Sequence, residues 1–262
     1  MTDKNVSPEL SAAEFSELFR KALEINGLED ILGKENVESD FYTLARLLLD
    51  FNSHTNITAI TDTKGLILAH FVDCLTVAPL IPKGASVADI GCGGGFPTLP
   101  LAIVRPDVKI HAIDSTQKKL NFVSSAANEL GLRNITPLCI RAEEGANDPL
   151  MRESFDFVTA RAVSALPVLC ELCLPYLKNG GIFCAMKGPR GAEELSASKN
   201  AVQKLGGAVC SAKKLSLISP AGGDALERML ILIKKVSPTP ECYPRAYGKA
   251  LSAGSVDRSA ET

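Results

Sequence analysis

The chain has 262 residues, of which 46% are hydrophobic and 22% are charged, as in ordinary soluble globular proteins. Its 28 basic and 30 acidic residues leave a net charge of −2, which excludes attraction of nucleic acid by overall charge. The first ten residues lack the basic-then-apolar pattern of a signal peptide. The most apolar stretch, residues 66–81, is interrupted by His70 and Asp73, and we expect it to be too short to span a bilayer. These features predict a cytoplasmic protein without a membrane span.

The eight cysteines stand in apolar settings such as PLCIRA and GIFCAMK, which is typical of free thiols in a reducing compartment. Cys170 and Cys173 form the one close pair. A zinc site would need further ligands nearby, but His54, His70 and His111 are all distant in sequence. We therefore predict no metal site.

Three helical segments are predicted in the first 80 residues. Apolar residues recur at helical spacing over residues 10–26 and stop at an Asn-Gly pair. A second helix is predicted from Ser39 or Asp40 through FYTLARLLLDF, and a third over about residues 64–79. We therefore assign residues 1–80 to an N-terminal helical appendage.

Seven short apolar runs follow, and helix-like segments separate most of them. They read SVADIG, VKIHAID, ITPLCI, FDFVTA, GGIFCAMKG, GAVCSAKKL and RMLILIKK. Such runs are typical of buried parallel strands joined by right-handed crossovers, and the last two predict an antiparallel hairpin. We predict an α/β fold with a seven-stranded, mostly parallel, doubly wound sheet over residues 81–236. Residues 237–262 are rich in Pro, Gly and Ser, and we predict an extended C-terminal tail.

The glycine-rich stretch DIGCGGGF follows the first predicted strand, where sheets of this kind bind ligands. Counting from Gly91, the dinucleotide pattern G-x-G-x-x-G fails because Phe96 stands where the third glycine belongs. The observed G-x-G-x-G, with Gly93 at its centre and Asp89 before it, is instead typical of S-adenosylmethionine sites. There the acid interacts with the ammonium group of the ligand, directly or through water. We therefore predict S-adenosylmethionine as the cofactor.

Two further segments fit a nucleoside-containing ligand. Asp114 ends the second predicted strand, 23 residues after Gly91, where an acid accepts hydrogen bonds from ribose hydroxyls. This holds for dinucleotides and for S-adenosylmethionine alike, so Asp114 does not separate them. The third strand is followed by IRAEE, and in methyltransferases this loop lies along the adenine. Ala142 and Glu143 are the candidate contacts there.

The fourth predicted strand is followed by TARAVS, which carries no recognisable base. Methylation of an exocyclic base amine would be expected to need an Asp- or Asn-Pro-Pro-aromatic turn at that place. Carbon methylation of pyrimidines would need a cysteine in a Pro-Cys or Thr-Cys setting, and neither dipeptide occurs. An acceptor with its own lone pair, such as N7 of guanine, needs no deprotonation. The missing machinery favours such an acceptor, for which positioning supplies most of the rate gain.

Basic residues follow four of the predicted parallel strands, whose ends share one edge of the sheet. They are Lys118, Lys119, Arg141, Arg161 and Lys187. We expect these cations to ring the cofactor mouth and to meet an anionic acceptor, of which a polyanion fits best. A methyltransferase for a small anionic metabolite is the alternative. A non-catalytic nucleotide-binding module or an NAD-dependent oxidoreductase is a third interpretation, which the absent third glycine disfavours.

Several stretches together resemble one known family. They are TNITAITD, HFVDCLTVAPLI, VADIGCGGGFPTLPLAIVRPD, AIDSTQKKLNFV, FDFVTARAVSALPVL and AMKG. Over about residues 40–235 the chain resembles the bacterial small-subunit ribosomal RNA guanine-N7 methyltransferases, formerly called glucose-inhibited division protein B. The resemblance implies the fold of S-adenosylmethionine-dependent methyltransferases, S-adenosylmethionine as donor and a guanine of ribosomal RNA as acceptor.

The resemblance also implies site residues by matching motif. The cofactor contacts would be Gly91, Phe96, Ala142, Glu143 and Arg161, and the substrate-side candidates Asn56, His70, Arg141 and Lys187. Many members carry a longer Pro-Gly-Lys-rich tail after Tyr-Pro-Arg, of which YPRAYGKALSAG keeps only the beginning. We expect a monomer that acts on ribosomal RNA or on a partly assembled small-subunit ribosomal particle.

Overall fold

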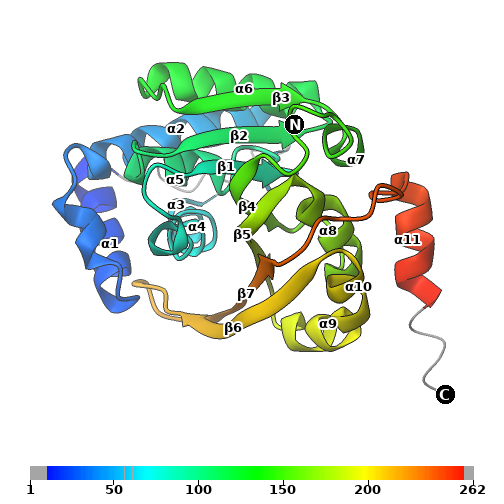
Figure 1. Cartoon of the computed structure of the whole chain (residues 1–262). Coiled ribbons are helices and arrows are strands. Elements are labelled where there is room, and N and C mark those ends of the chain that lie inside the picture. The colour runs from blue at the N-terminus through cyan, green and yellow to red at the C-terminus, as the bar shows by residue number, and fades with distance from the viewer. Residues whose placement is uncertain (1–10, 56, 61, 257–262) are drawn as a thin grey trace, which may run out of the picture.

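A seven-stranded sheet forms the centre of the molecule (Figure 1). The structure is a computed structural model, which describes residues 11–55, 57–60 and 62–256. The strands are β1 (Ser86–Ile90), β2 (Lys109–Asp114), β3 (Ile135–Cys139), β4 (Phe155–Arg161), β5 (Leu177–Lys187), β6 (Gly207–Leu217) and β7 (Leu226–Lys235). Their order is β3-β2-β1-β4-β5-β7-β6; the first five strands pair in parallel, while β7 pairs antiparallel with both β5 and β6. The predicted α/β sheet and its closing hairpin are confirmed.

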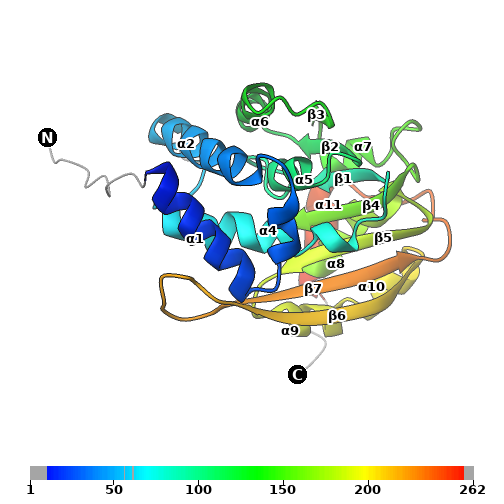
Figure 2. The ribbon, with the colours of Figure 1, turned by 90° about the vertical axis from the view of Figure 1, so that its left-hand side faces the viewer.

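Helices cover both faces of the sheet (Figure 2). One face carries α1 (Ala12–Ile25), α2 (Val37–Thr55), α3 (Thr63–Leu66), α4 (Asp73–Leu75), α5 (Thr98–Val104) and α6 (Gln117–Glu129). The other carries α7 (Ala142–Gly145), α8 (Leu166–Cys173), α9 (Gly191–Ala197), α10 (Lys199–Lys204) and α11 (Tyr247–Val256). Each layer of helices buries its apolar residues against the sheet, so the molecule has one hydrophobic core on each face.

The three helical segments predicted near the N-terminus are present. Ser11 starts α1 with a capping box, since its hydroxyl accepts from the Glu14 backbone N–H at 3.3 Å and the Glu14 carboxylate accepts from the Ser11 N–H at 2.9 Å. The second helix begins at Val37, two residues before the predicted Ser39. These helices share one continuous core with the sheet, through residues such as Phe71. The predicted boundary at residue 80 therefore marks a change of secondary structure, and as a domain boundary it stays a prediction.

The turns from Thr63 to Leu80 form a single run of helix, with a π-helical segment at Ile67–Val72. Against expectation, this stretch is long and apolar enough to cross a membrane by length and composition, with mean hydropathy 1.3 over 18 residues. Half of it is buried inside the protein, where Phe71 packs against other phenylalanines. Packing in the core accounts for its apolar composition.

The predicted extended tail, residues 237–262, is wrong for its middle part, because Tyr247–Val256 forms α11. The chain reaches this helix along the surface from β7, and α11 lies beside α8 (Figure 1). A side-chain contact between Arg245 and Glu171 of α8 fixes its start. This partner lies 74 residues away in sequence, so the local composition carries no signal for it.

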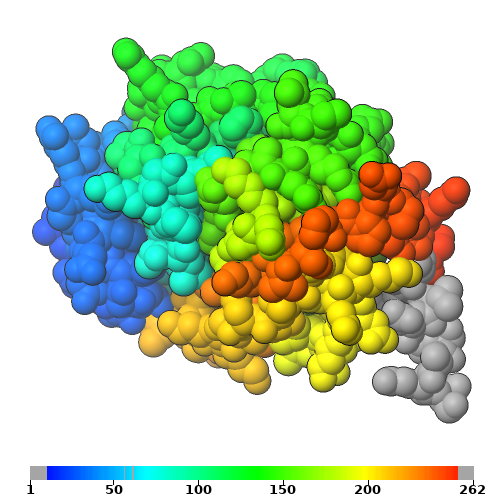
Figure 3. Space-filling model, in the orientation of Figure 1, coloured from blue at the N-terminus to red at the C-terminus, as the bar shows by residue number. Residues whose placement is uncertain are grey.

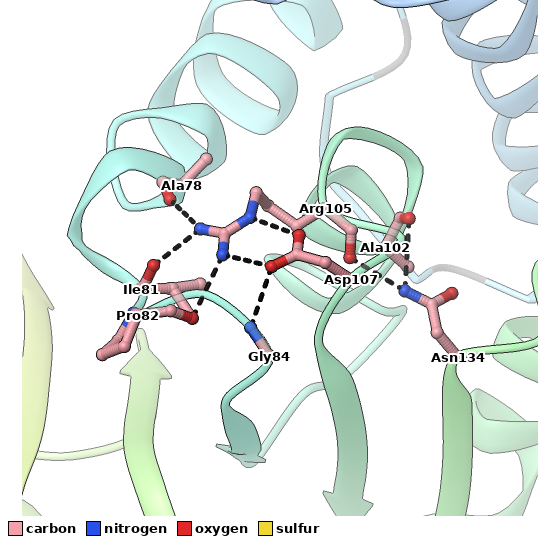
Figure 4. Close-up of polar contacts among 8 residues, drawn as sticks. All are labelled: Ala78, Ile81, Pro82, Gly84, Ala102, Arg105, Asp107 and Asn134. Atoms are coloured by element: carbon pink, nitrogen blue, oxygen red, sulfur yellow. Dashed lines mark hydrogen bonds and ion pairs between the residues drawn. The ribbon is translucent and has the colours of Figure 1, made fainter.

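A polar cluster closes the amino edge of the sheet, where β1, β2 and β3 begin (Figure 4). We call it the Arg105 junction, formed by Ala78, Ile81, Pro82, Gly84, Ala102, Arg105, Asp107 and Asn134. The Arg105 guanidinium donates to three backbone carbonyls of the segment before β1 and to both oxygens of Asp107, at 2.7–3.1 Å. Asn134 donates to two more carbonyls, at 3.1 and 3.3 Å. The junction therefore joins the N-terminal helices to the sheet.

Candidate cofactor site

A cavity of about 310 Å³ opens at the carboxyl edge of β1, β2, β3 and β4. Its lining comes from the last residues of β1 and β2, from the segments that follow the four strands up to the starts of α6 and α7, and from one residue each of α8 and α11. They are Ile90, Gly91, Ile113, Asp114, Ser115, Thr116, Lys119, Ile140, Arg141, Ala142, Glu143, Ala162, Val163, Leu172 and Tyr247. A second cavity of about 350 Å³, between α1 and α2, contains none of the predicted site residues. The first cavity has the position at which open α/β sheets bind ligands.

The glycine loop forms one wall of this cavity. Gly91 has φ +70°, and a Cβ there would lie 2.6 Å from a methyl group of Val163, so both conformation and space require glycine. The Gly91 N–H donates to the Ile113 carbonyl at 2.8 Å, which draws the loop against the end of β2. Gly93 has φ +56°, and nothing lies within 4 Å of where its Cβ would be. Gly93 is not among the residues that line the cavity, but a ligand that reached this part of the loop would meet bare backbone.

Asp114 connects the glycine loop to the end of β2. One oxygen of its carboxylate accepts from the Gly93 N–H at 3.0 Å, and the other accepts from the Thr116 N–H at 2.8 Å. Each carboxylate oxygen can accept two hydrogen bonds, so both retain a lone pair. Because Asp114 lines the cavity, these lone pairs are available to ribose hydroxyls.

Residues at the start of α7 form the opposite wall. Ala142 and Glu143 line the cavity, as predicted for the loop after β3. The buried Tyr176 hydroxyl donates to the Ala142 carbonyl at 2.7 Å and fixes this backbone. Arg141, the residue before α7, also lines the cavity and is exposed.

Arg161 ends β4 and lies behind the glycine loop instead of lining the cavity. Its guanidinium donates to the Ala69 carbonyl at 2.8 Å and to the Asp73 carboxylate at 3.2 Å. Asp73 is buried and also pairs with Arg228 at 3.2 Å. Arg161 is thus bound by the helical run that contains Ala69 and Asp73, and its guanidinium is not free to meet an anionic substrate.

His70 is held neutral beside Arg161. The Arg161 guanidinium, which only donates, lies 3.0 Å from His70 Nδ1, so this nitrogen accepts and the proton is on Nε2. Nε2 then donates to the Thr58 hydroxyl at 2.8 Å. Burial and the nearby Arg161 and Arg228 lower the pKa of His70 to about 3. With both nitrogens engaged, His70 orients its neighbours and does not act as a base.

Phe96 completes this group. Its ring centroid lies 4.7 Å from that of His70, and the Arg161 guanidinium lies 5.7 Å from the centre of the Phe96 ring. Phe96 is buried and does not line the cavity. The structure therefore brings Phe96, Arg161 and His70 together, next to the glycine loop and on the side of the N-terminal helices.

The prediction that Lys187 and Arg161 belong to a ring of free cations at the cofactor mouth is wrong for both residues. Lys187 is 8% exposed, its ammonium lies 2.6 Å from the Glu194 carboxylate, and it donates to the Ser164 carbonyl at 2.8 Å. The cause is α9, which returns over the end of β5 and brings Glu194 onto the lysine. Arg141 and Lys118 are exposed, and Lys119 lines the cavity; Asn56 lies outside the described residues.

Asp89 is fully buried beneath the glycine loop and does not line the cavity. One carboxylate oxygen accepts from the Thr98 hydroxyl at 2.6 Å and from the Thr98 N–H at 3.2 Å, which ties β1 to the start of α5. The other oxygen has no hydrogen-bond partner. Burial raises the pKa of Asp89 to about 7. Contact with a ligand ammonium group stays a prediction, since the carboxylate lies behind the loop.

Comparison with known proteins decides the family. A family model described as "rRNA small subunit methyltransferase G" matches residues 37–219. The chain belongs to this family. The curated methyltransferase G of Clostridium perfringens is 39% identical over 237 residues, covering 90% of this chain and 96% of its own. That of Deinococcus radiodurans is 44% identical over 213 residues, covering 80% and 83%.

Solved structures show that this chain has the fold of S-adenosylmethionine-dependent methyltransferases. An S-adenosylmethionine-dependent methyltransferase from Aquifex aeolicus superposes with TM-score 0.52 at 20% identity, covering 70% of this chain and 98% of the other. TYW2 of M. jannaschii, solved in complex with S-adenosylmethionine, gives TM-score 0.51 at 17% identity, covering 68% and 80%. The predicted fold type is confirmed.

The residues that line the cavity fit S-adenosylmethionine. Asp114 offers unused lone pairs for the ribose, and Gly93 leaves the backbone open. Apolar side chains such as Ile140 and Leu172 suit the adenine. Sequence reasoning missed Val163, whose methyl groups pack against Gly91, and Tyr247, which lies in the predicted extended tail. The place of Val163 just after β4 was the available signal; Tyr247 had none.

Proposed function

We propose that this chain transfers a methyl group from S-adenosylmethionine to N7 of a guanine in small-subunit ribosomal RNA. The observation that carries the proposal is a cavity in which Gly91, Asp114, Ala142 and Glu143 meet, in a chain of the methyltransferase G family. The curated relatives are named ribosomal RNA small subunit methyltransferase G, which supports ribosomal RNA as the acceptor.

The residues of the site supply binding and orientation. When bound, S-adenosylmethionine supplies an electrophilic methyl group on a positively charged sulfur. Asp114 would hold the ribose, the start of α7 would flank the adenine, and the open backbone at Gly93 would leave room for the rest of the ligand. Correct placement of two reactants alone supplies up to roughly 7–11 kcal/mol of rate enhancement.

No proton needs to be removed from the acceptor, because N7 of guanine has a free lone pair. The side chains of the site agree with this chemistry. His70 has both ring nitrogens engaged, and Asp89 is covered by the glycine loop. Asp114 and Glu143, the carboxylates among the described lining residues, lie where the ribose and adenine are expected. A small anionic metabolite as acceptor remains the alternative, and the product of the reaction separates the two.

The substrate would approach a surface that retains some free positive charge. Arg141 and Lys118 are exposed at the carboxyl edge, and each can meet a phosphate. We further propose that the enzyme acts as a monomer in the cytoplasm, without a metal ion and away from membranes. Its substrate would be ribosomal RNA or a partly assembled small-subunit particle.

The test is transfer of labelled methyl groups from S-adenosylmethionine to total bacterial RNA that lacks the modification, followed by nucleoside analysis. The expected product is 7-methylguanosine in small-subunit ribosomal RNA. Deproteinised RNA and small-subunit particles are compared in parallel, and the faster reaction identifies the substrate form. Label in another nucleoside, or in a small molecule only, would contradict the proposal.

A further inference from the structure

The C-terminal helix α11 contributes a wall to the cofactor cavity. Its first residue, Tyr247, lines the same cavity as Asp114 and Ala142. Tyr247 is half-buried and packs against the core on the face of α8. None of the sequence motifs that carry the family resemblance includes Tyr247.

A partly buried ion pair fixes the start of α11. The Arg245 N–H and Nε donate to one oxygen of Glu171 at 2.7 and 2.9 Å, and Nη2 donates to the other oxygen at 2.6 Å. Glu171 belongs to α8 and is 4% exposed. A carboxylate held by two guanidinium bonds and one backbone bond has a defined orientation. Tyr247, two residues after Arg245, is therefore placed by this pair.

A second arginine braces the C-terminal segment against the opposite wall of the cavity. Arg152 donates to the carbonyls of Tyr243 and Thr239, both at 2.9 Å. It also donates to the Ala146 carbonyl at 3.2 Å, at the end of α7. The same guanidinium thus holds the helix that carries Ala142 and the segment that leads to Tyr247.

The face that α11 turns to the protein is consistent with this role. Ala250 lies three residues after Tyr247, on the same side of the helix, and is 2% exposed. Lys249 is exposed. In the space-filling view the orange and red surface of the C-terminal segment lies directly against the green surface above it (Figure 3). The segment is packed onto the body of the protein at the position of the cavity.

We propose that Tyr247 is a cofactor-binding residue whose ring packs against the adenine of S-adenosylmethionine, with Arg245 and Glu171 as its positioning residues. The proposal rests on S-adenosylmethionine being the ligand of this cavity. Asp114 and the glycine loop provide the polar contacts, which suit the ribose and the methionine part. The flat, apolar adenine is the part that an aromatic ring binds best, by stacking.

The first test measures the affinity of three ligands by calorimetry, with adenosine followed by competition where it binds weakly. The ligands are S-adenosylmethionine, S-adenosylhomocysteine and adenosine. Tyr247→Ala is expected to weaken all three by about 5- to 150-fold, because all three contain adenine. Tyr247→Phe keeps the ring and should stay within about threefold, and Lys249→Ala, the matched control on the same helix, within about twofold.

Unchanged affinity of a folded Tyr247→Ala protein for all three ligands would overturn the inference and leave the proposed function intact. A loss confined to S-adenosylmethionine and S-adenosylhomocysteine would also overturn it, because the ring would then touch the amino acid part. A wild-type protein that binds none of the three would instead overturn the proposed function.

The second test asks whether Arg245 acts through Tyr247. Arg245→Ala is expected to weaken S-adenosylmethionine in the wild-type background by several-fold, because α11 loses its anchor. In the Tyr247→Ala background the same change should have an effect below about twofold, since the ring it positions is gone. Equal effects in both backgrounds would show that Arg245 does not position Tyr247.

Discussion

At the amino edge of the sheet, the five N–H donors of Arg105 all have partners, three of them backbone carbonyls and two of them oxygens of Asp107. At the carboxyl edge, the buried Asp89 carboxylate keeps one oxygen without a partner, and Asp114 keeps unused lone pairs facing the cavity. Both edges are rich in charge. At the amino edge the polar groups bond to other parts of the chain, whereas at the carboxyl edge some hydrogen-bond acceptors remain unused and can bind a ligand.

The difference teaches how to separate structural from functional charges in this fold. A charge whose partners are complete contributes to folding and has nothing left to offer a substrate. A polar group with remaining capacity costs stability in the free protein and gains partners when the ligand binds. The two edges should therefore respond oppositely to mutation, in stability at one edge and in binding at the other.

The largest effect is expected for Arg105→Ala. The change removes five hydrogen bonds and leaves the Asp107 carboxylate without its partner, although the Gly84 N–H still donates to it at 3.0 Å. We expect a loss of about 3 kcal/mol in the free energy of unfolding, measured with urea. The affinity of the folded protein for S-adenosylmethionine should stay within about twofold. A loss below about 1 kcal/mol would show that the Arg105 junction contributes little to the stability of the fold.

The next effect is expected for Asp114→Ala, with the opposite pattern. The variant loses the carboxylate that we propose for the ribose and should bind S-adenosylmethionine about 10- to 150-fold more weakly, or roughly 1.5–3 kcal/mol. Calorimetry measures this loss. Glu144→Ala, which removes an exposed acid of α7 outside the cavity lining, is the matched control and should bind normally. Normal binding by a folded Asp114→Ala protein would show that Asp114 does not bind the ribose.

A smaller effect is expected from the pH dependence of Asp89→Asn. Burial raises the pKa of Asp89 to about 7 in the folded protein, from about 4 when unfolded. Between these values the folded state binds the proton more strongly, so the contribution of Asp89 to the free energy of unfolding falls as pH rises from about 4 to 7. Above about pH 7 it changes no further.

The asparagine variant lacks this slope. Its free energy of unfolding relative to wild type should therefore increase by about 1–3 kcal/mol between about pH 4.5 and 8. His70, with its pKa lowered to about 3, adds a slope of opposite sign below about pH 6.5, but both proteins carry it and it cancels in the difference. A constant difference across this range would mean that Asp89 is ionised throughout.

The smallest effect concerns the salt dependence of RNA binding. It compares a paired cation with an exposed cation at the carboxyl edge. Lys187 is buried and bound to Glu194 and to the Ser164 carbonyl, whereas Arg141 is exposed. Arg141→Ala should make the slope of log affinity against log salt shallower by about 0.7–0.9, the share of one phosphate contact. Lys187→Ala should leave the slope unchanged and lower stability instead. Filter binding of ribosomal RNA across salt concentrations measures both, and a reversed order would contradict the distinction.

The sequence predicted the seven strands because each is a short apolar run, and it predicted the glycine loop because positive φ and close packing require glycine at Gly91. Asp114, Ala142 and Glu143 were correctly placed at the cavity because Asp114 ends a strand and the other two come shortly after one, and topology brings strand ends to one edge. Local pattern was sufficient wherever position along a strand decides the role of a residue.

The remaining features depend on partners that are distant in sequence. Lys187 ends a strand and was expected to be free, but α9 folds back and covers it with Glu194. Arg161 was expected at the rim, but the helical run that contains Ala69 and Asp73 binds its guanidinium. In the same way, α11 forms in a segment of weak helical pattern because Arg245 meets Glu171. Such pairings arise only when the chain folds.

The most direct test of the central claim is the stabilisation that S-adenosylmethionine confers on the wild type, Arg105→Ala and Asp114→Ala. Each protein is unfolded with urea in the absence and presence of the same excess of ligand. At about 100 times the dissociation constant, the ligand should add about 2.7 kcal/mol to the free energy of unfolding of the wild type. The account predicts the same gain, within about 0.4 kcal/mol, in the less stable Arg105→Ala protein, and a gain of only about 0.3–1.4 kcal/mol in Asp114→Ala. A full gain in Asp114→Ala, or its loss in Arg105→Ala, would contradict the division of roles between the two edges.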